Sequence, residues 1–318
     1  LTNWGANKVK SYRSFLSSAW SFDSNIKNIV KWTCTDMRYM FANAASFNRP
    51  LPSWKVNKVK SFRSFLSSAW SFDSSVKDLV KWQCTDMTYM FANAASFDQP
   101  VWTFKTQNVR SLLGTFGGAV KFNQPLRAWN TAKVTNMQQT FMAAYLFNGD
   151  IYPWNTARVT SLHQTFSQAF AFNKYIGDWN VANVKTLYGT FYEASSYDMG
   201  MNNWNVGRVT SFDHTFRHAS AFSKDIGNWD TGSAVSMSYT LASAAAFNRA
   251  LNWDTSKVTN MAGLFMMATS FNQARITSWD VSRVEQMQYL FSGAPFNQDV
   301  SGWDVRKVAN RFAVVMYN

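Results

Sequence analysis

Glutamate is almost absent from this chain, which has only Glu193 and Glu285, so nearly all of its negative charge comes from aspartate. The 18 acidic residues are outnumbered by 31 lysines and arginines, and the formal net charge is +13. A basic balance of this size bears on partners and solubility rather than on the fold. It predicts an anionic partner, which could be nucleic acid, anionic lipid, acidic polysaccharide or an acidic protein.

Cysteine is also scarce. Cys34 and Cys84 are the only two, and they occupy equivalent positions, 50 residues apart, in the repeat described below. If successive repeat units stack at strand spacing, two units separate these residues by about 10 Å. A disulfide needs Cα atoms within about 7 Å. We therefore predict two free, buried thiols, which give no argument for an oxidising compartment.

Several functional signatures are missing. No apolar run reaches the roughly 20 residues that span a bilayer, and no HExxH frame, glycine-rich phosphate loop or nucleophile elbow occurs. The three histidines are His163, His214 and His218, and the last two have a spacing that would present one edge of a metal site on a helix. Because no cysteine neighbours them and they lie in no HExxH frame, this signal is weak. We predict no catalytic, cofactor or metal site, no small-molecule substrate and no enzyme activity.

Aromatic residues and a tandem repeat dominate what is present. The 27 Phe, 15 Trp and 12 Tyr make up 17% of the chain and supply a large apolar core. A frame of 25 residues recurs, with one step of 24, one of 26 and one of 24 near the C-terminus. Its units begin at Trp4, Ile29, Trp54, Leu79, Phe104, Trp129, Trp154, Trp179, Trp204, Trp229, Trp253 and Trp279, and a partial unit covers 303–318.

The same residue types recur at fixed places when the first residue of each unit is position 0. Valine is common at position 5, an apolar residue at position 8, Phe or Leu at position 12 and an aromatic at position 18. Alanine occupies position 15 in all twelve complete units. Such periodicity is the signature of a solenoid whose units contact only their neighbours. We expect a single solenoid over 1–318.

The spacing within one unit predicts two elements. Positions 8, 11, 12 and 15 have the spacing of one helix face, so we expect a short helix of roughly ten residues. Alternating apolar residues around position 0, as in 179–181, favour a short strand. Packed helices lie about 8–10 Å apart and strands about 4.8 Å. An α/β solenoid of about twelve stacked turns, each with a short strand and a short helix, is therefore expected to be curved.

Two stretches carry a family resemblance, WDTSKVTNMAGLF in 253–265 and SGAPFNQDVSGWDVRKV in 292–308. They resemble the repeat of BspA-like leucine-rich-repeat surface proteins, a type abundant in Mycoplasma surface lipoproteins. The resemblance covers essentially the whole chain. It implies a leucine-rich-repeat-like solenoid with adhesion or protein-binding roles and no catalytic residues. The lysine-rich openings of the first four units depart from the family's repeat, and no lipid-attachment cysteine lies near Leu1.

A basic residue at position 4 is the main candidate for partner binding. Stacking would align these residues into a discontinuous cationic stripe, which Asp254, Asp280 and Asp304 at position 1 would partly neutralise. A solvated, partly paired face is the alternative interpretation. Trp20 and Trp70, together with Trp32 and Trp82, lie outside the usual tryptophan position and would mark an interface if exposed. The stripe comprises Lys8, Lys58, Lys133, Arg158, Arg208, Lys257, Arg283 and Lys307.

Two other regular columns favour structural roles. Asn or Asp follows the aromatic of position 18 in eleven of twelve units, and we expect these side chains to satisfy backbone groups as a ladder. Threonine at position 11 runs from Thr115 to Thr240 in six consecutive units. An ice-binding array is conceivable, but a bond from each hydroxyl back to a carbonyl is the favoured interpretation.

These observations predict a non-catalytic repeat scaffold that binds a macromolecular partner through an extended basic and aromatic face. The family resemblance favours an adhesion protein that is extracellular or on the cell surface. One alternative is a structural subunit of a larger assembly, organellar or membrane-associated, in which case the compartment would be an organellar lumen. A protein partner with an anionic surface is favoured, acidic polysaccharide and peripheral membrane association stay open, and nucleic acid is disfavoured because no recognised binding motif occurs.

Overall fold

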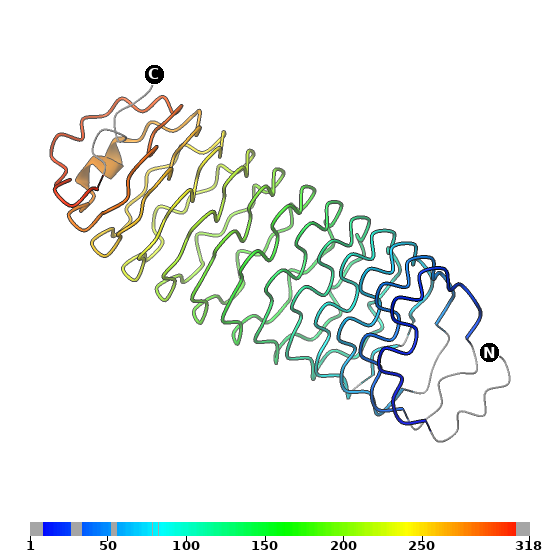
Figure 1. The fold of residues 1–318 in the computed structure, drawn as a ribbon. Helices are drawn as coiled ribbons and strands as arrows, with labels where there is room; N and C mark the ends of the chain where they lie inside the picture. The colour runs from blue at the N-terminus through cyan, green and yellow to red at the C-terminus, as the bar shows by residue number, and fades with distance from the viewer. Residues whose placement is uncertain (1–8, 27–33, 52–55, 78, 82, 310–318) are drawn as a thin grey trace. The chain divides into compact units, whose positions relative to one another are not determined.

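The structure is a computed structural model that describes residues 9–26, 34–51, 56–77, 79–81 and 83–309. The chain divides into two compact units, Leu1–Arg158 and Val159–Asn318. In each unit the backbone winds through successive similar turns that lie side by side (Figure 1). This confirms the repeat organisation, while the single solenoid over 1–318 stays a prediction.

Parallel bridges between equivalent residues fix the register of the turns. In the first unit Asp86 bridges both Ser61 and Ser111, and in the second Ser236 bridges both Ser211 and Asn260. All of these residues occupy position 7 of the repeat, including Asn260, which follows the step of 24 residues. The frame read from the sequence is therefore the frame in which the turns stack.

The prediction of a short helix at positions 8 to 15 is wrong. Across the described residues the structure has no α-helix, no strand longer than an isolated bridge, and one short 3₁₀ helix, η1, at Ala274–Ser278. Positions 10 and 14 have positive φ in all twelve complete turns, as at Tyr239 (52°) and Ser243 (56°). A right-handed helix cannot contain such residues. Positions 8 to 15 instead form consecutive β-turns.

The backbone hydrogen bonds explain why the turns replace the helix. Within a turn, Thr115 donates to the Leu112 carbonyl at 3.0 Å and Ala119 to the Phe116 carbonyl at 3.0 Å. Alternate N–H groups instead bond to the next turn, where Phe116 donates to the Thr140 carbonyl at 2.9 Å and Gly118 to the Met142 carbonyl at 2.6 Å. A ten-residue helix is marginal in water, whereas this alternation satisfies successive backbone groups within and between turns. The curvature was predicted from the wide spacing of packed helices, and this reason for curvature does not apply because the helices are absent from the described residues.

Aromatic side chains form parallel columns inside each unit. Phe116 stacks on Phe122 within its own turn, with ring centroids 3.9 Å apart, and on Phe141 of the next turn at 5.8 Å. Trp204 and Trp229 stack at 6.3 Å, and the Trp229 indole Nε1 donates to the Met201 carbonyl at 3.1 Å. Burying the tryptophan edge against a carbonyl satisfies its one polar group.

The threonine and Asx columns have the structural roles expected of them. Thr215 is fully buried, and its hydroxyl donates to the carbonyls of Phe212 at 2.6 Å and Leu187 at 3.1 Å. A hydroxyl that is buried and hydrogen-bonded to two carbonyls offers no surface to ice. In the Asx column, the N–H of Asn123 donates to the Asp98 carboxylate at 2.8 Å. The same bond links successive turns on both sides of this pair.

The turn of 26 residues holds its extra residue in η1, which precedes Trp279. Ile276 of η1 is buried, so the inserted segment still contributes to the core.

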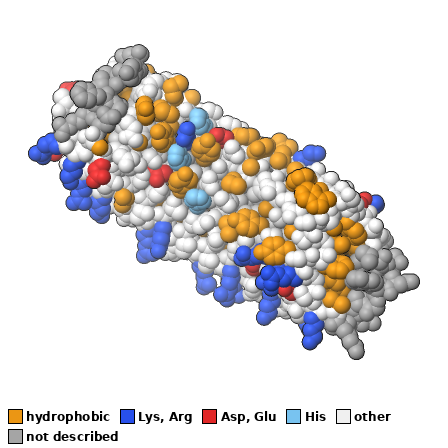
Figure 2. Space-filling view, in the orientation of Figure 1, with side chains coloured by type: hydrophobic (Ala, Val, Ile, Leu, Met, Phe, Trp, Pro, Cys, Tyr) orange, Lys and Arg blue, Asp and Glu red, His pale blue; other side chains and the backbone are white. Residues whose placement is uncertain are grey.

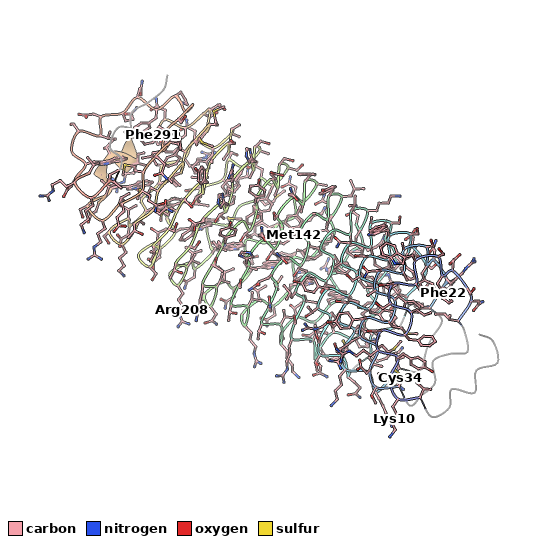
Figure 3. The ribbon with its side chains drawn as sticks, in the orientation of Figure 1. Lys10, Phe22, Cys34, Met142, Arg208 and Phe291 are labelled. Carbon is pink, nitrogen blue, oxygen red and sulfur yellow. The ribbon has the colours of Figure 1, made fainter. Side chains whose placement is uncertain are left out.

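Cys34 and Cys84 are free and buried, as the sequence predicts. Figure 3 marks Cys34. The Cys84 thiol donates to the Asp86 carbonyl at 3.6 Å. Burial raises the pKa of Cys84 to about 12, because the thiolate loses its hydration, and it also raises the pKa of Cys34.

Replacing Ala169 with leucine tests the packing at position 15. Ala169 is fully buried, its N–H donates to Phe166 and its carbonyl accepts from Phe172, so a larger side chain overpacks a site with fixed backbone. We expect the free energy of unfolding to fall by about 1–3 kcal/mol in chemical denaturation. Ala246→Leu, at an exposed alanine, is the matched control and should change it by less than about 0.5 kcal/mol. Equal effects would contradict the packing explanation.

The native thiols are expected to resist a chromogenic disulfide reagent at pH 8. The thiolate is the reacting species, and the folded protein holds Cys84 protonated and away from solvent. Both thiols should react once the protein is unfolded in denaturant. Because the folded pKa lies above the ordinary value of 9.0, the contribution of Cys84 to stability is complete below pH 9 and declines as the pH rises toward about 12. Rapid titration of Cys84 in the native protein would refute its burial.

Candidate binding surfaces

The basic stripe of position 4 lies on the surface of each unit. Its seven described members, from Lys58 to Lys307, are all exposed, and Lys8 lies outside the described residues. Figure 3 shows Arg208 extending outward from the backbone. The Arg208 guanidinium donates to the Asn183 amide oxygen at 2.8 Å, and Lys133 donates to Asn108 at 2.6 Å. Both acceptors occupy position 4 of the preceding turn, so the column is aligned.

The aspartates of position 1 do not pair with the stripe. Asp254 accepts the N–H of Ser256, and Asp280 accepts the N–H of Ser282. Asp304 forms an ion pair with Arg306 at 2.7 Å. Hydrogen bonds from Ser256 lower the pKa of Asp254, and the charge of Lys257 contributes less. No ion pair involves a stripe residue in the part of the chain that the structure describes.

Trp20 and Trp70 are exposed, at 57% and 51% of their surface. They lie two turns apart with Ala45 at the same position of the turn between, and their rings meet edge to face at 6.2 Å. Two tryptophan rings in contact expose a large apolar patch to solvent, which is typical of an interaction site. Trp32 and Trp82 lie outside the described residues.

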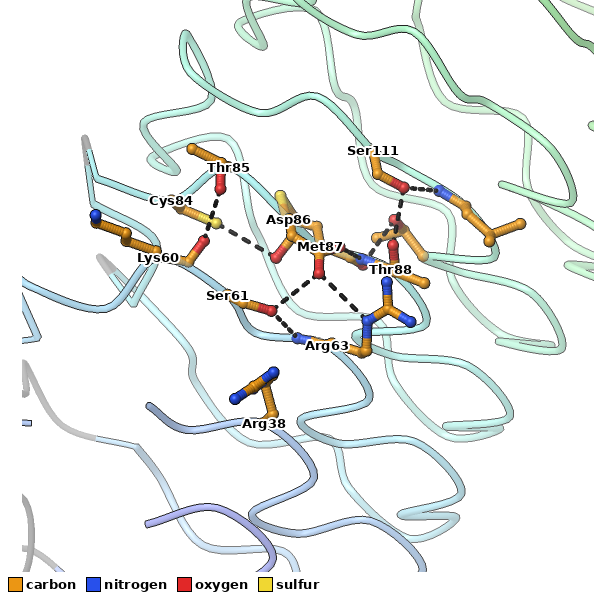
Figure 4. A network of polar contacts seen from close by, with 12 residues as sticks. Arg38, Lys60, Ser61, Arg63, Cys84, Thr85, Asp86, Met87, Thr88 and Ser111 are labelled. Carbon is orange, nitrogen blue, oxygen red and sulfur yellow. Dashed lines mark hydrogen bonds and ion pairs between the residues drawn. The ribbon is translucent and has the colours of Figure 1, made fainter. Parts of the chain in front are cut away.

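A polar network around Asp86 in the first unit was not foreseen from the sequence (Figure 4). The Asp86 carboxylate accepts bonds from the Ser61 hydroxyl at 3.0 Å, the Thr88 N–H at 2.9 Å and the Arg63 Nε at 3.3 Å. Burial by itself would raise the pKa of Asp86, but the hydrogen bonds from Thr88 and Ser61 and the charge of Arg63 bring it below its ordinary value. The network joins neighbouring turns through position 7.

A second feature that sequence reasoning missed is a shallow pocket of about 200 Å³ in the second unit. We call it the aromatic–arginine pocket. The side chains come from positions 9, 10 and 13 of neighbouring turns, where residue types vary, so the periodic signal does not show them. Its lining is Gln164, Tyr188, Gly189, Tyr192, His214 and Arg217.

The arginine of this pocket is held between tyrosine rings. The Arg217 guanidinium carbon lies 5.0 Å from the ring centroid of Tyr239 and 5.9 Å from that of Tyr192. Its Nη1 is 3.4 Å from Nδ1 of His214. Because arginine only donates, this contact requires an unprotonated Nδ1. Burial, aided by the charge of Arg217, lowers the pKa of His214, so the ring is neutral at pH 7.

The three histidines gather on one face of the second unit, beside hydrophobic side chains (Figure 2). His214 and His218 occupy positions 10 and 14 and have positive φ, so the helix face that would have aligned them for a metal is absent. The Tyr192 ring contacts both, with centroid distances of 6.4 and 6.2 Å. The described residues contain no cluster of three metal-ligating side chains, and no helix among them has the length and apolar character to cross a membrane.

Comparison with known proteins agrees with the repeat. A family profile described as "Mycoplasma protein of unknown function, DUF285" matches residues 1–94, 77–175, 147–252 and 250–317. The chain belongs to this family. Among solved structures, a leucine-rich repeat protein from Bacteroides ovatus is similar over 87% of this chain and 76% of that chain, with 10% identity and a TM-score of 0.43. No curated protein matches the chain.

Replacing Asp86 with asparagine tests the polar network. The folded pKa of Asp86 is lowered, so its charge contributes stability above the ordinary aspartate value of 3.8, and this contribution is lost as the pH falls below it. We expect the variant to unfold about 1–2 kcal/mol more easily at pH 7 in denaturant titration, with a smaller difference at pH 3. Glu285→Gln, at an exposed carboxylate, is the control. A difference that does not depend on pH would rule out this electrostatic role.

Proposed function

We propose that this protein is a non-catalytic repeat scaffold that binds an anionic macromolecular partner through the basic stripe. The main support is that the stripe cations among the described residues are exposed and recur at one position of stacked turns. They form no ion pair with any residue that the structure describes. A surface cation that no intramolecular carboxylate neutralises is available to an external anion.

The geometry of the stripe favours an extended partner. Stacked turns repeat at about the 4.8 Å strand spacing, so cations in neighbouring turns are closer than the roughly 8 Å Debye length at physiological salt. Such charges act together on a linear polyanion or on an acidic protein surface. Their attraction steers association and weakens as salt is added.

The family resemblance supports an adhesion role outside the cell or on its surface. In that setting the repeats would present a long surface to a protein or an acidic polysaccharide.

The second candidate function is a structural subunit of a larger assembly, and the tryptophan pair favours it. Trp20 and Trp70 are more than half exposed and contact each other. Aromatic side chains are enriched where interfaces contribute most binding energy. In this version the pair packs against a neighbouring subunit.

Reversing charges in the stripe tests the leading proposal. The variant Arg208→Glu, Lys257→Glu, Arg283→Glu should elute from a polyglutamate column at a clearly lower salt concentration than the unchanged protein. Each cation that contacts the polyanion contributes to its salt-dependent affinity. Melting temperature is measured in parallel, and these exposed positions should leave it nearly unchanged.

The control variant is Lys121→Glu, Lys174→Glu, Arg249→Glu, which makes the same change in net charge away from position 4. It should retain most of the column affinity. If the two variants elute together, net charge alone governs binding and the stripe is not a site.

A further inference from the structure

We propose that the aromatic–arginine pocket binds a carboxylate-bearing pyranose, as found in the uronic acid residues of acidic saccharides. This site is separate from the basic stripe and does not depend on the function proposed for it. The lining residues all come from the second unit.

The arginine supplies the carboxylate contact. Tyr192 and Tyr239 hold the Arg217 guanidinium by ring contacts, so that its terminal nitrogens are the groups a ligand would meet. Arg217 also forms no described ion pair. A guanidinium positioned in this way keeps N–H donors for a planar, two-oxygen acceptor.

The nearby acids do not fill this role. Glu193 accepts a bond from Gln168 at 3.0 Å, and hydrogen bonds from Tyr192 and Gln168 keep its pKa low against the effect of burial, with a smaller contribution from the charge of Arg217. Asp213 accepts bonds from the Ser238 N–H and hydroxyl, both at 2.8 Å. Neither carboxylate lines the pocket.

The charge of the lining favours a carboxylate over a phosphate. Arg217 is the only cationic side chain of the lining, because His214 is neutral at pH 7. Phosphate sites in proteins gather several cations or a row of backbone N–H groups. One guanidinium matches the single charge of a carboxylate.

The remaining walls suit a sugar ring. Tyr188 stacks on His163 with 4.8 Å between ring centroids and meets His214 edge to face at 5.4 Å, so the ring is fixed in place. A fixed aromatic wall packs against the C–H face of a pyranose. The Tyr192 hydroxyl donates to Glu193 and can still accept a hydrogen bond from a sugar hydroxyl. Ligand sites combine such apolar walls with a few polar groups.

The absence of a side chain at Gly189 leaves room for the aromatic–arginine pocket. Gly189 has φ of +56°, and a Cβ built on it would lie 3.2 Å from Cγ of Gln164. Other turns have glutamine at this position with the same sign of φ, at Gln139 and Gln164. Glutamine at residue 189 is therefore compatible with the backbone and would fill the pocket.

The test titrates the full chain with methyl glucuronide by NMR or calorimetry, with methyl glucoside and N-acetylglutamate amide as comparison ligands. We expect saturable binding of the glucuronide, and losses of about ten- to a hundredfold for Gly189→Gln and Arg217→Gln. Arg217→Lys keeps the charge but not the planar fork and should recover only part of the affinity. Lys185→Gln, which removes an exposed cation three residues before Tyr188 in the sequence, should bind like the unchanged protein. Circular dichroism and melting temperature confirm that each variant folds.

The outcomes separate this proposal from the stripe. Absent glucuronide binding, or binding unaffected by both pocket variants, overturns it, and so does equal binding of methyl glucoside or tighter binding of N-acetylglutamate amide. The triple stripe variant should bind glucuronide normally, whereas the pocket variants should keep their affinity for the polyglutamate column. Each site can therefore fail without the other.

Discussion

The hydrogen bonds between successive turns are the interaction on which the rest of the structure depends. Alternate N–H groups at positions 8 to 14 bond to carbonyls of the next turn, while those at positions 11 and 13 close β-turns within their own turn. This alternation demands left-handed residues at positions 10 and 14, which the chain supplies with five glycines, such as Gly114 and Gly118, and with other residue types in the remaining cases. The cost of left-handed φ in those other residues is offset by neighbouring turns that hold them in place.

Much of this fold can be predicted from the sequence, because side-chain periodicity reports which residues face inward. The frame, the aromatic and alanine columns, the Asx ladder and the two free thiols all follow from it. The local conformation does not follow, since positions 8, 11, 12 and 15 face the core in a run of β-turns as they would in a helix. Tyrosine and serine rarely adopt positive φ, so Tyr239 and Ser243 give no sequence signal for it. The pattern therefore gives the burial correctly and the backbone wrongly.

One of the two candidate binding surfaces could be predicted from the sequence, and the other could not. The stripe could be predicted because its cations recur at one position, and the structure places the described ones, such as Arg208, on the surface. The aromatic–arginine pocket could not, because it occurs once and combines Tyr188, Tyr192 and Arg217 from positions that vary between turns. Since backbone bonds hold the turns together, outward side chains are free to vary, and a local site can arise on one stretch of a regular scaffold.

The most direct test of this account is a scalar coupling across a hydrogen bond, measured by NMR on deuterated, isotope-labelled protein. The amide nitrogen of Phe216 lies 2.8 Å from the carbonyl oxygen of Thr240 in the next turn, so it should couple to the carbonyl carbon of Thr240. In a helix the same amide would bond to the carbonyl of Phe212. Coupling to Thr240 is the result expected, and coupling to Phe212 would contradict the hydrogen bonding between turns.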